Sequence, residues 1–146
     1  YELGTEILEQ FGLVAALEEL LSKIKDNGYT ELQLITNGIQ ERLPKEVEIT
    51  LYKIIGELVT NALKHANAKE ISIQLILKDN TLRVMVEDDG IGFLIDSMNN
   101  GRHMGLRSVD SRVKKLDGEV EIDSAPGKGT LVTLTIPINS ESNNEE

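Results

Sequence analysis

Residues 71–86, ISIQLILKDNTLRVMV, alternate apolar and polar side chains on both sides of a short polar break. Strict alternation is typical of a strand with one covered face, because successive side chains point to opposite faces of a sheet. The dipeptide Asp79-Asn80 in the break suits a tight hairpin turn. The stretch therefore predicts two antiparallel strands joined by a hairpin.

The rest of the chain supplies further strands and helices around this hairpin. Alternating runs over 119–124 and 130–136 flank a turn with Pro and Gly and predict a second pair, and 31–36 predicts one more strand. Apolar side chains recur at helical spacing in three segments, 11–25, 45–66 and 105–116. We therefore expect an α/β (α+β) fold, a two-layer sandwich of a mixed, mostly antiparallel sheet covered on one face by about three helices.

The composition limits the classes of protein that the chain can represent. Its 146 residues suit one domain, and a hydrophobic content of 40% favours a folded core over disorder. Cysteine is absent, which excludes disulfides, thiolate metal sites and cysteine nucleophiles. The formal net charge of −10 argues against a nucleic-acid partner, since phosphate backbones attract Lys and Arg.

The two ends of the chain differ from its middle. Residues 139–146 are polar without an apolar anchor, and we expect a disordered tail there. The first residue is Tyr rather than Met, which is typical of a fragment and leaves a membrane segment upstream open. Within the chain itself, no apolar run has the length of a membrane span and no signal peptide is visible.

One edge of the longest expected helix carries polar side chains of complementary chemistry. Glu57, Asn61, Lys64 and His65 follow at i, i+4, i+7 and i+8, which places them in one stripe. The Asn oxygen suits a Mg²⁺ ion that already carries phosphate oxygens, and Lys supplies a point charge for phosphate. The alternative is a solvated helix face with a hydrogen bond from Asn to Glu.

Two strands bring a carboxyl and a hydroxyl group to the expected core side. Asp88 shares the parity of the apolar residues before it, and a buried carboxylate needs donors, for which an adenine amino group is suitable. Gly90 and Gly92 follow and allow the backbone to approach a flat ring. Thr130 opens the last strand with inward parity. The alternatives are that the strand ends before Asp88, and that Thr130 is an ordinary β-branched residue.

A glycine-containing loop leads into the third expected helix. The segment 101–106 reads Gly101-Arg102-His103-Met104-Gly105-Leu106, and the helix is expected to start at about Gly105. Backbone N–H groups at a helix start form an anion site. The alternative is a surface loop before an ordinary helix start.

Four segments together resemble the conserved boxes of histidine kinases. Residues 57–66, ELVTNALKHA, resemble the N box, and 88–93, DDGIGF, resemble the first glycine box. Residues 105–109, with Arg112 further on, are similar to the second glycine box, and 124–130, SAPGKGT, resemble the closing Gly-x-Gly-Thr element. The order and the separations also fit, which makes the set far more specific than any single glycine motif.

The resemblance places the chain in the GHKL superfamily, with DNA gyrase, the MutL mismatch-repair ATPase and a large heat-shock chaperone, whose nucleotide site is the Bergerat fold. It implies that Asp88 binds the adenine amino group, that Thr130 completes the adenine network, that Asn61 coordinates Mg²⁺, and that 93–104 form an ATP lid. The expected nucleotide-binding residues are Asn61, Lys64, His65, Asp88, Gly90, Gly92, Gly101, Arg102, His103, Gly105, Leu106 and Thr130.

The implied activity is binding of Mg-ATP and transfer of its γ-phosphate to a histidine on a separate dimerisation domain. Glu57, Asn61 and Lys64 are the expected catalytic residues, with Glu57 orienting or deprotonating that histidine or a water. Arg102 or His103 adds positive charge. Neither histidine of the chain is expected to be the phosphoacceptor, because the His-Asp or His-Glu context is absent.

Domain and partner expectations follow from the same resemblance. Residues 11–138 form the catalytic domain, and 1–10 are the end of a linker from the phosphoacceptor helices. Residues 11–17, FGLVAAL, resemble the entry into this domain in kinases that pair with LuxR-like response regulators. The expected partners are the phosphoacceptor and dimerisation helices and a response regulator. The fragment itself is expected to be a monomer in the cytoplasm, and whether the full-length protein is anchored in the inner membrane is left open.

Some residues depart from the family pattern, and two rival functions stay open. His103 stands where the second glycine box usually has its first glycine, and Asp117-Gly118 stands where Gly-Gly is usual. One rival is a GHKL serine kinase of the anti-sigma type or a clamp ATPase. The other is a non-catalytic nucleotide-binding module that docks partners.

Overall fold

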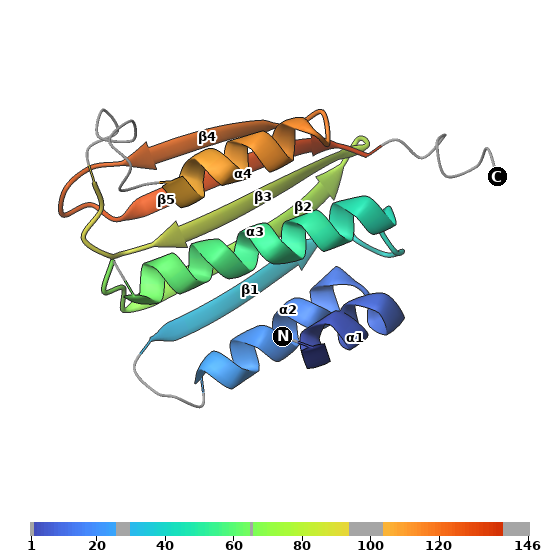
Figure 1. Ribbon diagram of the computed structural model, residues 1–146, viewed down its shortest axis with the longest axis horizontal. Helices are drawn as coiled ribbons and strands as arrows, with labels where there is room; N and C mark the ends of the chain where they lie inside the picture. Colours follow the sequence, from blue (N-terminus) through green and yellow to red (C-terminus); the bar gives the residue numbers. More distant parts are fainter. Residues whose placement is uncertain (1, 26–29, 65, 94–103, 139–146) are drawn as a thin grey trace.

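The computed structural model describes residues 2–25, 30–64, 66–93 and 104–138 of the chain. Within these ranges, the chain forms four helices and a five-stranded sheet (Figure 1). The elements in chain order are α1 (Glu2–Phe11), α2 (Leu13–Lys25), β1 (Glu31–Asn37), α3 (Lys45–Lys64), β2 (Glu70–Lys78), β3 (Thr81–Asp88), α4 (Met104–Lys114), β4 (Glu119–Ser124) and β5 (Thr130–Pro137).

The sheet has the strand order β1-β2-β3-β5-β4. β1 runs parallel to β2, and the other neighbours are antiparallel, so the expected mixed and mostly antiparallel sheet is confirmed. Figure 1 shows α3 and α4 on one face of the sheet, with α1 and α2 beside the β1 edge. The two-layer arrangement of the predicted fold class is thus observed.

The hairpin of β2 and β3 follows its sequence pattern residue by residue. Lys78 pairs with Thr81 across the turn, and the two residues between them have positive φ angles of 52° and 60°. Positive φ at both central positions matches the right-handed twist of paired strands, and Asp and Asn tolerate it. The apolar members of the alternation face the core at 4% exposure or less, and they are Ile71, Ile73, Leu75, Leu82, Val84 and Val86.

Helix α3 is the centre of the hydrophobic core. Leu51, Ile54, Ile55 and Val59 are fully buried, because they lie on the side of the helix that faces the sheet. Each such side chain contributes roughly 1.5–3 kcal/mol by leaving water. This burial fixes α3 across the sheet and thereby places the polar stripe along its edge.

The N-terminal segment forms a helix that the sequence interpretation as a linker end did not include. α1 buries Leu8, and it ends before Gly12, where φ is 97° and the N–H of Gly12 donates to the Leu8 carbonyl at 3.0 Å. This left-handed residue separates α1 from α2, so the helix expected over 11–25 begins at Leu13. The helix count within the described residues is four instead of about three.

None of the described helices combines the length and the apolar character that crossing a bilayer requires.

Candidate functional site

Three segments meet where β3 ends, at the left of Figure 1. The N–H of Ile91 donates to the Ala66 carbonyl at 2.8 Å, which ties the residues after β3 to the end of α3. The N–H of Gly127 donates to the Ile91 carbonyl at 2.6 Å, which ties the same residues to the turn between β4 and β5. Segments that are far apart in the sequence therefore form one backbone-linked junction.

Glycines allow this junction to close. A side chain at Gly90 would collide with the Ala66 carbonyl, and one at Gly129 would collide with the Asp88 carbonyl. Gly129 also has a φ of 76°, which a Cβ atom makes unfavourable. Gly92, expected near the nucleotide, packs against the Ala125 and Gly129 carbonyl groups in the turn between β4 and β5. The glycines of the first glycine box thus have a visible packing role.

Asp88 is the last residue of β3 and pairs in register with Thr130 on β5. The strand therefore does continue to Asp88, and the alternative that it ends earlier is wrong. The carboxyl is half-buried, and its Oδ1 accepts the Gly90 N–H at 2.8 Å. Burial raises the pKa of Asp88, against the opposing effect of the Gly90 N–H. A carboxylate whose pKa is raised by burial is stabilised in its charged form by each further hydrogen-bond donor, which a ligand can supply.

Ser124 belongs to the same network, and the sequence interpretation missed it. Its Oγ lies 2.9 Å from Thr130 Oγ1, donates to the Gly129 carbonyl at 2.9 Å and accepts the Phe93 N–H at 3.0 Å. Because the single hydroxyl hydrogen of Ser124 goes to Gly129, Thr130 is the donor between the two hydroxyls. Its position at the end of β4, in phase with Val120 and Ile122, was the available signal.

The polar stripe of α3 reaches the junction. Asn61 is half-buried, Lys64 is exposed at the last position of the helix, and the Asn61 carbonyl accepts the Ala66 N–H at 3.2 Å. Glu57 forms an ion pair with Arg112 on α4, with Nη1 and Oε1 2.8 Å apart. The stripe is therefore partly packed under α4 and partly open near the junction.

Several expected site residues cannot be placed with the others. His65, Gly101, Arg102 and His103 lie outside the described residues. Gly105 and Leu106 lie in the first turn of α4, which begins at Met104, one residue before the expected start. A helix therefore does start where the anion site was expected, and the binding of an anion there stays a prediction.

The chemistry of the donors at this end of α3 fits Mg²⁺ bound together with phosphate. Magnesium keeps several waters and takes few protein ligands beside phosphate oxygens, and the half-buried Asn61 amide offers one neutral oxygen. Within the described ranges, no group of three or more His, Asp or Glu side chains is arranged as a metal site of its own. The described residues therefore suit a Mg²⁺ ion that is held jointly by the protein and by the phosphates of a nucleotide.

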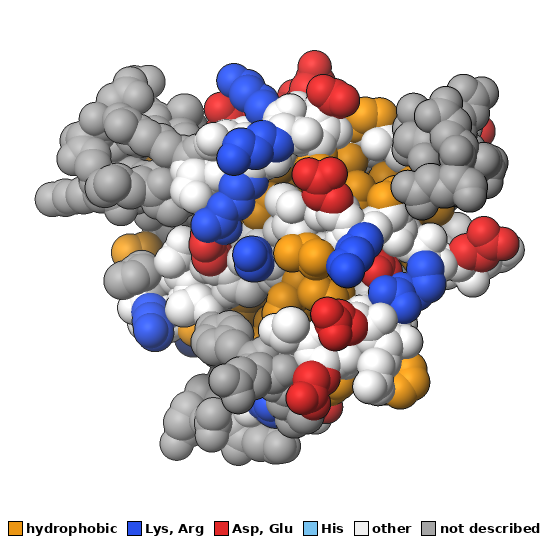
Figure 2. Space-filling model, turned by 45° about the vertical axis from the view of Figure 1, so that its right-hand side comes forward, with side chains coloured by type: hydrophobic (Ala, Val, Ile, Leu, Met, Phe, Trp, Pro, Cys, Tyr) orange, Lys and Arg blue, Asp and Glu red, His pale blue; other side chains and the backbone are white. Residues whose placement is uncertain are grey.

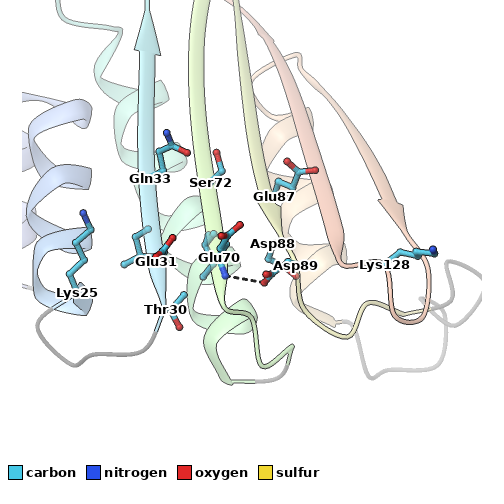
Figure 3. Close-up of a pocket in the computed structure, with 12 residues that line it drawn as sticks. Lys25, Thr30, Glu31, Gln33, Glu70, Ser72, Glu87, Asp88, Asp89 and Lys128 are labelled. Atoms are coloured by element: carbon cyan, nitrogen blue, oxygen red, sulfur yellow. Dashed lines mark hydrogen bonds between the residues drawn. The ribbon is translucent and has the colours of Figure 1, made fainter.

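A hollow on the opposite face of the sheet has the wrong charge for a nucleotide. Figure 3 shows Gln33, Ser72 and Glu87 along it, with Asp88 and Asp89 at its margin. Its lining carries more negative than positive side chains, which disfavours anionic phosphates. The charged residues are Glu31, Glu70, Glu87, Asp88 and Asp89, with Lys25 and Lys128. Figure 2 shows the helical face with the end away from the junction turned forward, and Lys and Arg side chains lie there together with Asp and Glu around exposed hydrophobic atoms. We therefore place the candidate nucleotide site on the helical side.

Comparison with known proteins agrees with this geometry. Residues 46–140 match the family described as histidine kinase-, DNA gyrase B- and HSP90-like ATPase. An uncharacterized sensor-like histidine kinase of Chloroflexus aurantiacus is 40% identical over 147 positions, covering 96% of this chain and 25% of that protein. Sensor histidine kinase ComP of Bacillus subtilis is 34% identical over 141 positions, covering 94% of this chain and 18% of that protein.

Solved structures give the same result. The histidine kinase domain of a blue-light activated kinase from Erythrobacter litoralis EL346 is similar with a TM-score of 0.72 and 27% identity, over 90% of this chain and 63% of that one. The chain thus belongs to the histidine kinase-, DNA gyrase B- and HSP90-like ATPase family. Within it, the chain is an ATP-binding catalytic domain of the sensor histidine kinase type, and it spans a quarter or less of the two curated relatives above.

Proposed function

We propose that this domain binds Mg-ATP and transfers the γ-phosphate to a histidine on a separate dimerisation domain. The observation that carries the proposal is the half-buried Asp88 carboxylate in register with Thr130, at a junction that glycines close against the end of α3. An aminopurine supplies a further donor to this carboxylate, beside the Gly90 N–H. The family membership of the chain makes ATP the nucleotide of choice.

The residues of the chain have separate roles in this proposal. Asp88 accepts a hydrogen bond from the adenine amino group. Thr130 donates its hydroxyl hydrogen to Ser124, so its lone pairs remain free to accept a hydrogen bond in the adenine network. Asn61 would hold Mg²⁺ through its neutral amide oxygen, and Lys64 offsets phosphate charge. When bound, the ion would supply positive charge that offsets the negative charge of the phosphates.

The remaining expected residues act on the phosphate side. The backbone around Gly105 and Leu106 receives phosphate at the start of α4, together with Gly101 and with Arg102 or His103. Glu57 orients or deprotonates the accepting histidine. Catalysis of this kind depends on positioning and charge neutralisation rather than on covalent chemistry by the domain.

The partners in this proposal are the phosphoacceptor and dimerisation helices of the same kinase and a response regulator, of the LuxR-like class. The supporting observation is that the similar proteins are named sensor histidine kinases and are much longer than this chain. A cytoplasmic site of action follows from the location of ATP and is part of the proposal.

Binding of a non-hydrolysable ATP analogue tests the nucleotide site. We expect Asp88→Asn to weaken binding by about 10- to 100-fold, because a hydrogen bond to a charged group contributes roughly 1.5–3 kcal/mol. Asp123→Asn, an exposed change on β4, is the matched control and is expected to bind as wild type. Unchanged affinity in Asp88→Asn would refute the adenine assignment.

The metal assignment has its own test. In the wild type, adding Mg²⁺ is expected to strengthen analogue binding, and in Asn61→Ala most of that gain is lost. An equal gain from Mg²⁺ in both proteins contradicts the role of Asn61. Transfer of phosphate to a histidine of the cognate dimerisation domain then separates the kinase from its rivals. Fast steady-state hydrolysis without that domain favours a clamp ATPase, and binding without any transfer favours a docking module.

A further inference from the structure

An ion pair joins α3 to α4 close to the residues that we assign to the phosphates. Arg112 Nη1 donates to Glu57 Oε1 at 2.8 Å, although 55 positions separate the two residues in the chain. The side chains are 35% and 40% exposed. The pair therefore lies at the rim of the helical layer, where a ligand or a substrate side chain can reach it.

Stability alone does not account for this pair. α4 is already held in the core by Val109 and Val113, which are 1% and 0% exposed. An ion pair between partly exposed side chains adds little to that, because water screens the charges and both side chains lose conformational freedom. What the pair does determine is the direction of the Glu57 carboxylate.

The position of Glu57 makes this direction important. Glu57 lies four residues before Asn61 and seven before Lys64 on α3, so the three share one edge of the helix. Arg112 occupies Oε1, and among the described residues no hydrogen bond to Oε2 is found. The carboxylate therefore retains an acceptor oxygen for a group that arrives beside the phosphates.

We propose that Arg112 is a positioning residue for phosphotransfer. Through its planar guanidinium it holds the Glu57 carboxylate on the edge of α3 that carries Asn61 and Lys64, and it does not itself bind the nucleotide. This inference rests on the proposed function, since transfer to histidine is the step that the oriented carboxylate serves.

The test compares Arg112→Met with Lys114→Met in the full-length sensor kinase. Lys114 is a matched control, because its ion pair with Asp110, at 3.2 Å, stays within α4. For Arg112→Met we expect phosphotransfer about 10- to 100-fold slower than in the wild type, as for a catalytic group displaced by about 1 Å. Its affinity for a non-hydrolysable ATP analogue stays unchanged, and its melting temperature stays within about 3 °C of the wild type. Lys114→Met is expected to match the wild type in all three measurements.

Two further variants ask whether Arg112 acts through Glu57. Arg112→Lys keeps the charge but loses the planar fork, so it restores only part of the transfer rate, at an unchanged KM for ATP. The double variant of Glu57→Gln and Arg112→Met is expected to be no slower than Glu57→Gln alone, because both changes remove one unit.

The outcomes separate the two levels of the argument. Equal transfer rates in Arg112→Met and Lys114→Met overturn the inference, as do additive losses in the double variant. A loss of analogue affinity in proportion to the loss of rate also overturns it, because Arg112 is then a nucleotide ligand. If the wild-type kinase binds no ATP analogue or transfers no phosphate to histidine, the proposed function itself fails, and the inference fails with it.

Discussion

The two ends of α3 handle charge in opposite ways. In its first turn, Glu48 is only 3% exposed, and both of its carboxylate oxygens are bound by protein donors. At the other end, Asn61 is half-buried and Lys64 is exposed, and backbone hydrogen bonds tie this end to the segment that follows the half-buried Asp88. The difference teaches that a buried charge whose donors are all internal serves the architecture, whereas polar groups with spare capacity mark the place for a ligand.

The first end is a clasp of three helices. Arg42 binds Glu48 through Nη2 at 2.7 Å and through Nε at 3.1 Å, and these hydrogen bonds raise the pKa of the guanidinium further. The same Arg42 Nη2 donates to the Leu8 carbonyl of α1 at 3.1 Å, and the Leu13 N–H of α2 donates to Glu48 Oε2 at 3.3 Å. Gly12, between the two helices, leaves room for this arrangement.

The second end is closed by backbone contacts instead of charge pairs. Gly90 and Gly129 let the chain approach Ala66 and Asp88 without side chains in between. The geometry of the carboxyl is therefore set by rigid backbone, while the carboxylate itself keeps room to accept further hydrogen bonds. The four predictions below use this contrast, in order of decreasing effect.

The largest effect is expected from Gly129→Ala. The new Cβ meets both an unfavourable φ of 76° and the Asp88 carbonyl, so we expect a loss of roughly 3 kcal/mol or more in unfolding free energy. Because Asp88 must shift, ATP-analogue affinity also falls at temperatures where the variant is folded. Thermal unfolding and titration calorimetry measure the two effects.

Gly127→Ala is the matched control for this change. Gly127 has a similar φ of 78°, but a Cβ there meets open space, so only the strain of about 1–2 kcal/mol is expected. Its affinity for the analogue stays at the wild-type value. Equal affinity losses in the two variants contradict the role given to the contact between Gly129 and Asp88.

The next effect belongs to the clasp end. Glu48→Ala leaves the N–H of Leu13 without its acceptor in a buried position, which costs about 1–3 kcal/mol of unfolding free energy. ATP-analogue affinity of the folded variant is unchanged, because the clasp is remote from the junction. Glu46→Ala is the control, since it removes an exposed Glu from the same first turn. If Glu48→Ala folds normally but binds the ATP analogue more weakly, the two ends of α3 do not have the separate roles assigned to them.

The elements whose side chains alternate or repeat strictly were predictable from the sequence. The hairpin of β2 and β3 and the long helix α3 appear within one or two residues of their expected bounds, because burial of one face is written directly into their periodicity. The pairing of Asp88 with Thr130 agrees with their parity for the same reason, since parity along a strand decides the face, whereas their roles toward a nucleotide stay predictions.

Features that depend on distant partners were not predictable. α1 has ten residues, a length at which an isolated helix is marginal, and its contacts come from Arg42 and from Tyr52 near Gly4. The partner of Glu57 is 55 positions away, so no local pattern indicates Arg112. The sequence thus predicts which groups lie on a face, but not which of them are already paired.

Asp88→Asn is expected to change the stability of the nucleotide-free domain less than Glu48→Ala does, and to raise it instead of lowering it. Burial raises the pKa of Asp88 in the folded state, so ionisation of this group disfavours folding. Its stabilising contribution is present below the unfolded-state pKa and is lost as pH rises through the folded-state pKa. At neutral pH we therefore expect Asp88→Asn to be more stable than the wild type, by less than about 1 kcal/mol because the carboxyl is half-exposed.

Thermal unfolding over a pH series checks this expectation, with Asp123→Asn as the control. The gain of Asp88→Asn over the wild type must disappear toward acid pH, where both side chains are neutral. In the wild type, affinity for the ATP analogue falls over the same range, since protonated Asp88 no longer offers the adenine a charged acceptor. A gain in stability that is independent of pH excludes ionisation of Asp88 as its cause.

The smallest effect is expected at the neighbouring carboxylate, and it has the reverse pH dependence. Asp89 Oδ1 accepts the backbone N–H groups of Glu70 at 2.9 Å and Lys69 at 2.8 Å, and these bonds lower the pKa of Asp89. Its contribution to stability is therefore present above the unfolded-state pKa and is lost as pH falls through the folded-state pKa. The group is exposed, and the amide oxygen of Asn can still accept both bonds, so Asp89→Asn costs about 0.5 kcal/mol or less at neutral pH. Thermal unfolding must show that this cost of Asp89→Asn disappears at acid pH, where the gain of Asp88→Asn also disappears. At neutral pH the two variants must therefore change stability in opposite directions. A change in the same direction contradicts the assignment of Asp89 to structure and of Asp88 to a ligand.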